Sequence, residues 1–151
     1  MANFLGSFTH AVDHKGRVNI PTKFRKHIPA DNDEALVVTR GLDGCLVAYP
    51  MDEWEKVDKR LRSLPATKQK TRQYIRIVTS QAISLSMDKQ GRIALPKTLL
   101  DLARIDSEIL FVGTLDHFEL WHPEDYKTIT NGSDQSYEDI AETIFDNDST
   151  P

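Results

Sequence analysis

The sequence has a single cysteine and no long apolar run. Cys45 has no partner within the chain, which excludes an internal disulfide and suits a reducing compartment. No stretch approaches the ~18 consecutive apolar residues that a membrane span needs. The first residues show no charged segment followed by an apolar one, so we expect no signal peptide. These absences favour a cytoplasmic protein without a membrane partner.

The sequence also lacks the residue patterns of common enzymes. His10 and His14 have the spacing of metal ligands on a helix, but here they flank a predicted strand and turn. His117 and His122 straddle a predicted strand and so point to opposite faces. No Gly-rich loop of the kind that holds phosphate is present. We therefore expect no enzymatic activity, no metal and no cofactor.

The charges are unevenly distributed along the chain. Residues 1–112 contain 18 Lys and Arg against 13 Asp and Glu, whereas residues 113–151 contain one Lys against 10 acidic residues. The net charge of −4 therefore combines a basic body with an acidic tail. This pattern is compatible with a nucleic-acid partner in spite of the negative total.

One segment of the sequence occurs twice. Residues 13–21 read Asp-His-Lys-Gly-Arg-Val-Asn-Ile-Pro, and residues 88–96 read Asp-Lys-Gln-Gly-Arg-Ile-Ala-Leu-Pro. Asp, Gly, Arg and Pro match in register, and alternating apolar residues flank both segments. Such self-similarity indicates two copies of one small structural unit.

Both copies predict the same order of elements. In the first copy we expect strands at 8–12 and 18–20, a short helix at 22–27 that follows Pro21, and a hairpin of strands 36–39 and 45–49 around Asp43-Gly44. In the second copy the equivalent elements are expected at 83–87, 92–95, 97–103, 109–112 and 118–121.

Two helices are predicted between the copies. Apolar residues at helical spacing indicate one helix over 52–64, which Pro65 ends, and another over 67–78. This insert carries a run of basic residues without an acid, which is either a solvated face or a contact surface. The run consists of Lys59, Arg60, Arg62, Lys68, Lys70, Arg72 and Arg76.

The elements divide the chain into four parts. We expect a first module at residues 4–50, a helical insert at 51–80, a second module at 81–124 and an acidic C-terminal segment at 125–151 that is partly disordered. Within that last segment, Tyr137, Ile140, Ile144 and Phe145 have helical spacing.

Five motifs carry a resemblance to a known family. They are Asp13-x-x-Gly-Arg17-Val-x-Ile-Pro21, Thr39-Arg40-Gly41-Leu42-Asp43-Gly44-Cys45-Leu46, Tyr49-Pro50-x-x-Glu53-Trp54, Asp88-x-x-Gly-Arg92-Ile-x-Leu-Pro96 and Phe118-Glu119-Leu120-Trp121. Over residues 4–126 the sequence resembles the MraZ family, whose modules belong to the AbrB-like group of DNA-binding β folds. The resemblance implies an α+β, β-rich fold: a pseudo-symmetric, swapped-hairpin or double-psi-like barrel of two tandem modules with inserted helices.

The resemblance also implies a function. MraZ-like proteins are transcription regulators that bind direct repeats in double-stranded DNA upstream of the division and cell-wall operon, which includes their own gene. They form homo-oligomers, and we expect a ring that associates with the nucleoid. The paired motifs would place Asp13, Arg17, Asp88 and Arg92 at the DNA-facing surface.

Arg104 departs from the family pattern. It stands where similar sequences have the left-handed Gly that closes the short helix, and we expect this conformation to cost about 1 kcal/mol for Arg.

The chemistry of the repeated turn suits DNA. An arginine offers a planar fork of donors that matches a phosphate or a guanine edge. The motif's Asp can accept amides of the turn or pair with the guanidinium. The candidate DNA-binding residues are Lys15, Arg17, Lys23, Arg25, Lys89 and Arg92, and the candidate structural residues of the motif are Asp13, Gly16, Asp88 and Gly91.

Two further expectations concern the share of the DNA contact that each copy makes and an alternative function. The second copy has Leu99 and Leu100 where the first has Phe24 and Arg25, so we expect the first copy to carry more of the DNA contact. The alternative function is an antitoxin-like regulator or an interaction module, whose acidic tail binds a protein partner.

Overall fold

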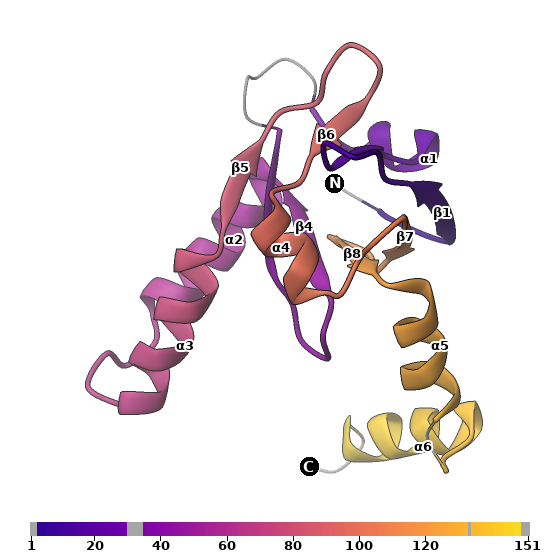
Figure 1. Cartoon of the computed structure of the whole chain (residues 1–151). Helices are drawn as coiled ribbons and strands as arrows, with labels where there is room; N and C mark the ends of the chain where they lie inside the picture. Colours follow the sequence, from indigo (N-terminus) through magenta and orange to yellow (C-terminus); the bar gives the residue numbers. More distant parts are fainter. Residues whose placement is uncertain (1–2, 30–34, 133, 149–151) are drawn as a thin grey trace.

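The computed structural model describes residues 3–29, 35–132 and 134–148. A six-stranded sheet, antiparallel at each described pairing, lies beside a two-stranded ribbon and is surrounded by helices (Figure 1). The α+β class predicted from the sequence is therefore confirmed. Within the described ranges, no helix has both the length and the apolar character needed to cross a membrane.

Both copies form the predicted series of elements. The first copy contains β1 (Ser7–Ala11), β2 (Arg17–Asn19), α1 (Thr22–Arg25), β3 (Leu36–Arg40) and β4 (Leu46–Pro50). The second copy contains β5 (Ile83–Leu85), β6 (Arg92–Ala94), α4 (Lys97–Leu102), β7 (Glu108–Gly113) and β8 (Phe118–Trp121). Helix α1 ends two residues earlier than expected, at Arg25.

The first strand of each copy pairs with a strand of the other copy. Strand β1 pairs with β7, where Phe8 lies opposite Phe111, and β5 pairs with β3, where Ser84 lies opposite Val37. The sheet order is β1-β7-β8-β4-β3-β5. If each strand is replaced by its equivalent in the other copy, the same order results, read from the opposite edge of the sheet. The two copies are thus related by a pseudo-twofold axis that passes between β8 and β4.

The closed barrel expected from the resemblance is not what the described residues form. Strands β1 and β5 lie at opposite edges of an open sheet, and β2 and β6 form a separate ribbon. The ribbon is lengthened by two bonds, from the Ile20 amide to the Gly91 carbonyl (3.0 Å) and from the Leu95 amide to the Gly16 carbonyl (2.9 Å). Among the described residues, no ladder joins this ribbon to the edges of the sheet.

One face of the ribbon packs on the core. Val18 and Ile93 lie opposite each other, and each is 1% exposed. The core beneath them includes the aromatic rings of Phe4, Phe24 and Phe118, whose centroids lie 5.1 to 5.3 Å apart. Because side chains alternate along a strand, burial of Val18 and Ile93 turns their neighbours outward.

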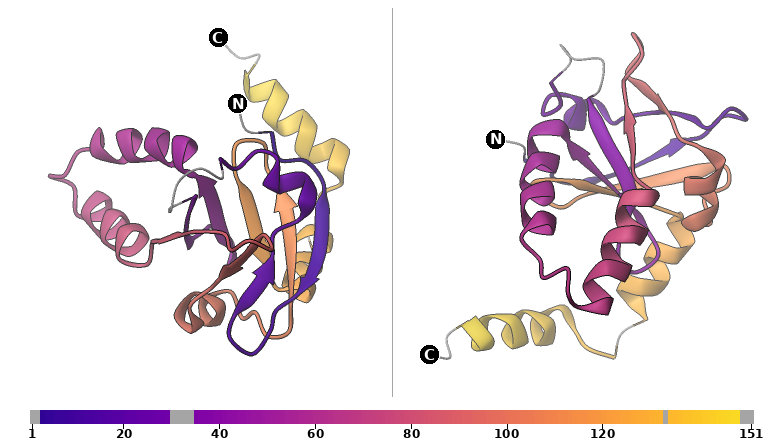
Figure 2. Two further views of the ribbon diagram at one scale, coloured as in Figure 1. Left: turned by 90° about the horizontal axis from the view of Figure 1, so that it is seen from above. Right: turned by 90° about the vertical axis from the view of Figure 1, so that its left-hand side faces the viewer.

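Two pairs of helices project from the sheet. Helices α2 (Met51–Arg62) and α3 (Gln69–Ser80) confirm the two helices predicted between the copies and form a hairpin (Figure 2). The buried Thr39 hydroxyl donates to the carbonyl of Val78 (2.7 Å) and ties the end of α3 to β3. Beyond β8 follow α5 (Pro123–Asn131) and α6 (Tyr137–Asp148). The partial disorder predicted for the segment 125–151 includes residues 149–151, which lie outside the described residues.

Candidate nucleic-acid interface

The first copy of the repeated motif forms a turn held by the carboxylate of Asp13. Oδ1 accepts the amides of Lys15 and Arg17, each at 2.9 Å, and Oδ2 accepts Nε of Arg17 at 2.7 Å. The backbone closes the turn with bonds from the Asp13 amide to the Arg17 carbonyl and from the Gly16 amide to the Asp13 carbonyl, both 3.0 Å. One side chain thereby fixes both the backbone and the guanidinium of Arg17.

The second copy repeats this geometry almost atom for atom. Oδ1 of Asp88 accepts the amides of Gln90 and Arg92 at 2.9 Å, and Oδ2 accepts Nε of Arg92 at 2.8 Å. The Gly91 amide donates to the Asp88 carbonyl at 3.0 Å. Two equivalent arginines are therefore presented by two equivalent turns.

The turn geometry keeps both aspartates ionised. The hydrogen bond from the Arg17 amide is the main cause that lowers the pKa of Asp13 from 3.8 to about 2, and the Arg17 side chain adds to it. The bond from the Arg92 amide lowers the pKa of Asp88 in the same way. A carboxylate that accepts several N–H groups is stabilised in its charged form, so the clamp persists at neutral pH.

Both turns need a residue that tolerates a positive φ. Gly16 has φ +79° and Gly91 has φ +77°, the region that glycine adopts without steric cost. A Cβ at Gly16 would collide with the backbone oxygen of Leu95, which belongs to the other copy. A Cβ at Gly91 would collide with the side chain of Arg25. The glycines therefore allow the turns to approach the opposite copy closely.

The outer face of the ribbon brings the two arginines together. Strand register places Arg17 opposite Ala94 and Asn19 opposite Arg92, so the four side chains share the face that points away from the core. Asn19 is not among the candidate residues predicted from the sequence. The alternation Arg17-Val18-Asn19 was the signal that could have found it, because it puts the first and third residues on one face.

The two arginines are partly exposed at this face. Their side chains are 36% exposed for Arg17 and 30% for Arg92. In each case Nε is bonded to the motif's aspartate. Within the described ranges, the terminal nitrogens of both guanidinium groups donate no hydrogen bond. These nitrogens form the planar pair of donors that a phosphate or guanine can accept.

The other basic candidates lie around the ribbon in different settings. Lys15 and Lys89 are exposed within the two turns. Lys23 on α1 is also exposed, and its Nζ lies 5.9 Å from the centre of the Phe8 ring. Within the described residues none of these three lysines is paired with an acid, so each adds a positive charge that is not compensated there.

Arg25 differs from the other candidates because its guanidinium is bonded within the protein. Nη1 donates to the Gln90 carbonyl at 3.0 Å, and Nη2 donates to the Thr22 hydroxyl at 2.7 Å. Arg25 on the first copy thus holds the turn of the second copy. At the equivalent place, Leu100 of the second copy lies near Gly16, so the two turns are supported by different chemistry.

The dimensions of the ribbon are compatible with a double helix. A two-stranded ribbon has the width that the major groove of B-DNA admits, about 12 Å. Across the described part of the chain, no group of three or more His, Cys, Asp and Glu is placed to hold a metal ion.

Comparison with known proteins agrees with the repeated architecture. The family model described as "MraZ protein, putative antitoxin-like" matches residues 3–77 and again residues 78–148. The chain is 41% identical over 143 residues to the "Transcriptional regulator MraZ" of Syntrophomonas wolfei subsp. wolfei, covering 95% of this chain and 97% of that protein. It is also 41% identical over 145 residues to the protein of the same description from Natranaerobius thermophilus, covering 96% and 99%. Since both halves match in tandem and the relatives are covered nearly end to end, the protein belongs to the MraZ family.

Proposed function

We propose that the protein is a sequence-specific transcription regulator that binds double-stranded DNA with the outer face of the β2–β6 ribbon. Its targets are direct repeats upstream of the division and cell-wall operon, which includes its own gene. It acts as a homo-oligomer, a ring, in the cytoplasm at the nucleoid. The names of the two relatives describe transcriptional regulators, which supports this class of function and a non-enzymatic role.

The observation that carries the proposal is the pairing of the arginines. Arg17 and Arg92 extend from matching turns onto one face, and each leaves its terminal nitrogens for a ligand. In this proposal they read base edges in the major groove, and Asn19 adds the donor and acceptor pair that matches adenine. Lys15, Lys23 and Lys89 bind phosphates, while Arg25 supports the second turn and adds charge.

The test is a DNA titration with the chain and two variants. We expect Arg17→Ala to weaken binding to DNA from upstream of the gene by about 5- to 150-fold, because a bidentate base contact contributes about 1–3 kcal/mol. Lys68→Ala, at the tip of the helical hairpin, should weaken it less, since a lysine there can contact only a phosphate. Affinity should also fall by orders of magnitude over a modest rise in salt.

Random DNA of equal length is the control. Arg17→Ala should lose most of the preference for the upstream DNA, and Lys68→Ala should keep it. Equal losses for both variants on both DNAs would contradict base reading by Arg17. Binding that does not respond to salt, or no binding to the upstream DNA, would contradict the function itself.

The pairing of each copy's first strand with the other copy supports the proposal that both modules build the DNA-binding ribbon together. Strands β1 and β5 each complete the sheet of the other copy, which is the relationship expected if the modules derive from the swapped hairpins of AbrB-like proteins. A single chain then supplies both halves of the DNA-binding ribbon.

A second candidate function rests on the C-terminal helix. The matched family carries the words "putative antitoxin-like" in its description, and α6 exposes Tyr137, Ile144 and Phe145. An interaction module that binds a different protein would use such a helix. Light scattering on the purified chain separates the two, because a second protein of fixed ratio would raise the mass by an amount that is no multiple of 17.2 kDa.

A further inference from the structure

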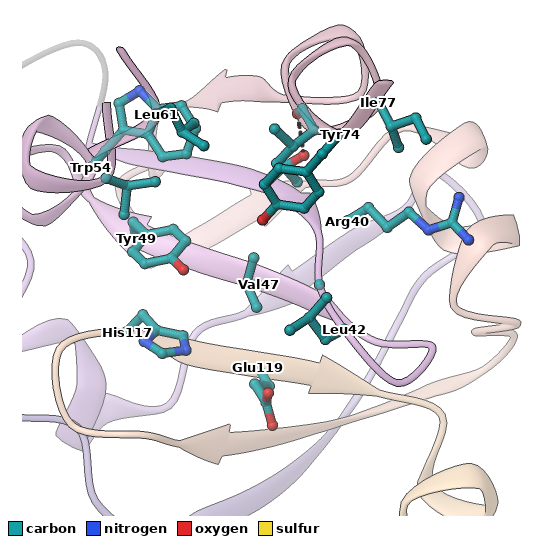
Figure 3. Close-up of a pocket in the computed structure, with 14 residues that line it drawn as sticks. Arg40, Leu42, Val47, Tyr49, Trp54, Leu61, Tyr74, Ile77, His117 and Glu119 are labelled. Carbon is teal, nitrogen blue, oxygen red and sulfur yellow. Dashed lines mark hydrogen bonds between the residues drawn. The ribbon is translucent and has the colours of Figure 1, made fainter. Parts of the chain in front are cut away.

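An apolar groove lies between the helical hairpin and the sheet. Its floor is formed by Val47 and Tyr49 of β4, and its walls come from α2 and α3 (Figure 3). The volume of the groove is about 460 Å³, which takes several side chains. The Tyr49 ring stacks on His117 at 4.9 Å between centroids and lies 5.9 Å from Trp54. The groove is therefore lined in part by aromatic rings that pack on one another.

The walls of this groove are not covered by the rest of the chain. Tyr74 is 48% exposed, Ile77 is 40% exposed, and Leu42 at the rim is 72% exposed. Large side chains gathered at one groove are typical of a surface that binds a partner. Arg40 also lines the groove and is exposed, so the apolar walls carry a positive charge at their edge.

Helix α6 carries an apolar stripe that the described part of its own chain leaves exposed. Tyr137, Ile140, Ile144 and Phe145 follow the spacing of one helix face and are between 42% and 83% exposed. None of them lines the groove of this chain. An amphipathic helix binds in a groove through residues at this spacing.

The charges of the two surfaces are opposite. The hairpin that borders the groove has seven exposed Lys and Arg between residues 59 and 76 and no acid in that run. Helix α6 has no basic residue, and it has Glu138 at the edge of its apolar stripe and Asp139, Glu142 and Asp146 on the opposite face. The tip of the hairpin lies away from the β2–β6 ribbon (Figure 1).

We propose that α6 of one chain docks in the α2–α3 groove of a second copy of this chain. The apolar stripe of α6 covers Tyr74, Ile77 and Trp54, and the negative charge of the helix as a whole favours its approach to the basic hairpin. Groove and helix are different surfaces, so the contact is head-to-tail, which extends from chain to chain and closes where the rotation permits. The proposal rests on the self-association included in the proposed function and assigns the surfaces that produce it.

Crosslinking between two differently labelled chains tests this contact. Full-length Tyr74→Cys is mixed with full-length Ile144→Cys, and a short bismaleimide is added. The native thiol does not interfere, because Cys45 is 1% exposed and burial, together with Glu119, raises its pKa to about 12. We expect a linked species of two chains that contains both variants.

The matched control is Glu142→Cys, which lies on the opposite face of the same helix. Mixed with Tyr74→Cys, it should give several-fold less of the linked species. Equal linking by both positions, or none by Ile144→Cys, would overturn the assignment. A Tyr74→Cys/Ile144→Cys double variant that links only within one chain would also overturn it, since α6 would then bind its own groove.

Light scattering distinguishes failure of this contact from failure of self-association. The wild-type chain should have a mass several times 17.2 kDa, and Ile144→Asp should reduce it towards that value while its circular dichroism is unchanged. An oligomer that survives Ile144→Asp would overturn the docking but leave self-association standing. A monomeric wild type would overturn both.

Discussion

Arg104 shows how one residue of this chain departs from the conformation its side chain prefers. It follows α4 with φ +58°, and the Ile105 amide closes the helix end on the Leu100 carbonyl at 2.9 Å. The left-handed position expected from the sequence is therefore present. The Arg104 guanidinium lies 3.5 Å from a carboxylate oxygen of Asp125 on α5, but the arginine is 77% exposed. Such a pair stabilises little.

Arg104→Gly should therefore stabilise the fold. Glycine adopts this conformation without the cost that Arg bears, so we expect a gain of about 1 kcal/mol. In a protein of this size that corresponds to a rise in Tm of about 2–4 °C. Thermal unfolding followed by circular dichroism measures it. Asp125→Ala serves as the control for loss of the ion pair and should change Tm by less; a lower Tm for Arg104→Gly would contradict the argument.

The pKa of Asp13 offers a second residue-scale prediction. A carboxyl with a lowered pKa stabilises the folded state above its ordinary pKa of 3.8, and this contribution is lost as the pH falls towards about 2. An NMR titration of the Asp13 carboxyl should have its midpoint near 2. In Arg17→Ala the midpoint should rise only part of the way to 3.8, because the backbone amide at residue 17 still donates. A complete return to 3.8 would show that the side chain, not the turn, lowers the pKa.

At the scale of elements, the ribbon combines near symmetry with one difference. The two arginines occupy equivalent places, but Asn19 of β2 corresponds to Ala94 of β6. The outer face therefore has an amide at one end and a methyl group at the other. A face that is unequal about its pseudo-twofold axis prefers one orientation on DNA, which suits direct repeats better than palindromes.

Asn19→Ala should remove this inequality. We expect a loss of about 1–3 kcal/mol of preference at one base pair of the site, because the bidentate amide contact with adenine is lost. Binding to random DNA should hardly change. The measurement is a set of affinities for sites in which each base pair is replaced in turn. A variant with the same base preferences as the wild type would show that Asn19 does not read DNA.

At the scale of the whole molecule, neither copy is a complete folding unit. Strand β1 finds its partner in β7, β5 in β3, and β2 in β6, so each copy leaves strands unpaired without the other. The core is shared in the same way, since Phe4 and Phe24 of the first copy pack on Phe118 of the second. The tandem arrangement in one chain keeps the two halves together at high effective concentration.

Separated halves should therefore fail to fold alone and recover together. We expect fragments 1–80 and 81–151 each to lack a cooperative thermal transition, because their unpaired strands and half-cores bury too little apolar surface. Mixed in equal amounts, they should regain the circular dichroism of the intact chain. A cooperative transition in either isolated fragment would contradict the interdependence of the copies.

The elements that the sequence determined by itself depend on near neighbours. The Asp13 turn needs only residues 13–17, because its bonds run from the aspartate to amides at most four residues away. The two helices of the insert follow from apolar spacing and from Pro65. The alternation through Val18 and Ile93 indicates which face of each short strand is buried. Such patterns can be read from the sequence because the interactions are local.

The tertiary structure alone decided which strands pair across the copies and what the outward surfaces contain. The guanidinium of Arg25 bonds to the carbonyl of Gln90, 65 residues away, which no local pattern predicts. The sheet is open and not a closed barrel: β1 and β5 lie at its two edges, and β2 and β6 pair with each other in a separate ribbon. The groove beside Tyr49 is lined by residues of β4, α2, α3 and β8, which lie far apart in the sequence. These features depend on contacts between distant segments, whose geometry is set by the packing of the whole chain.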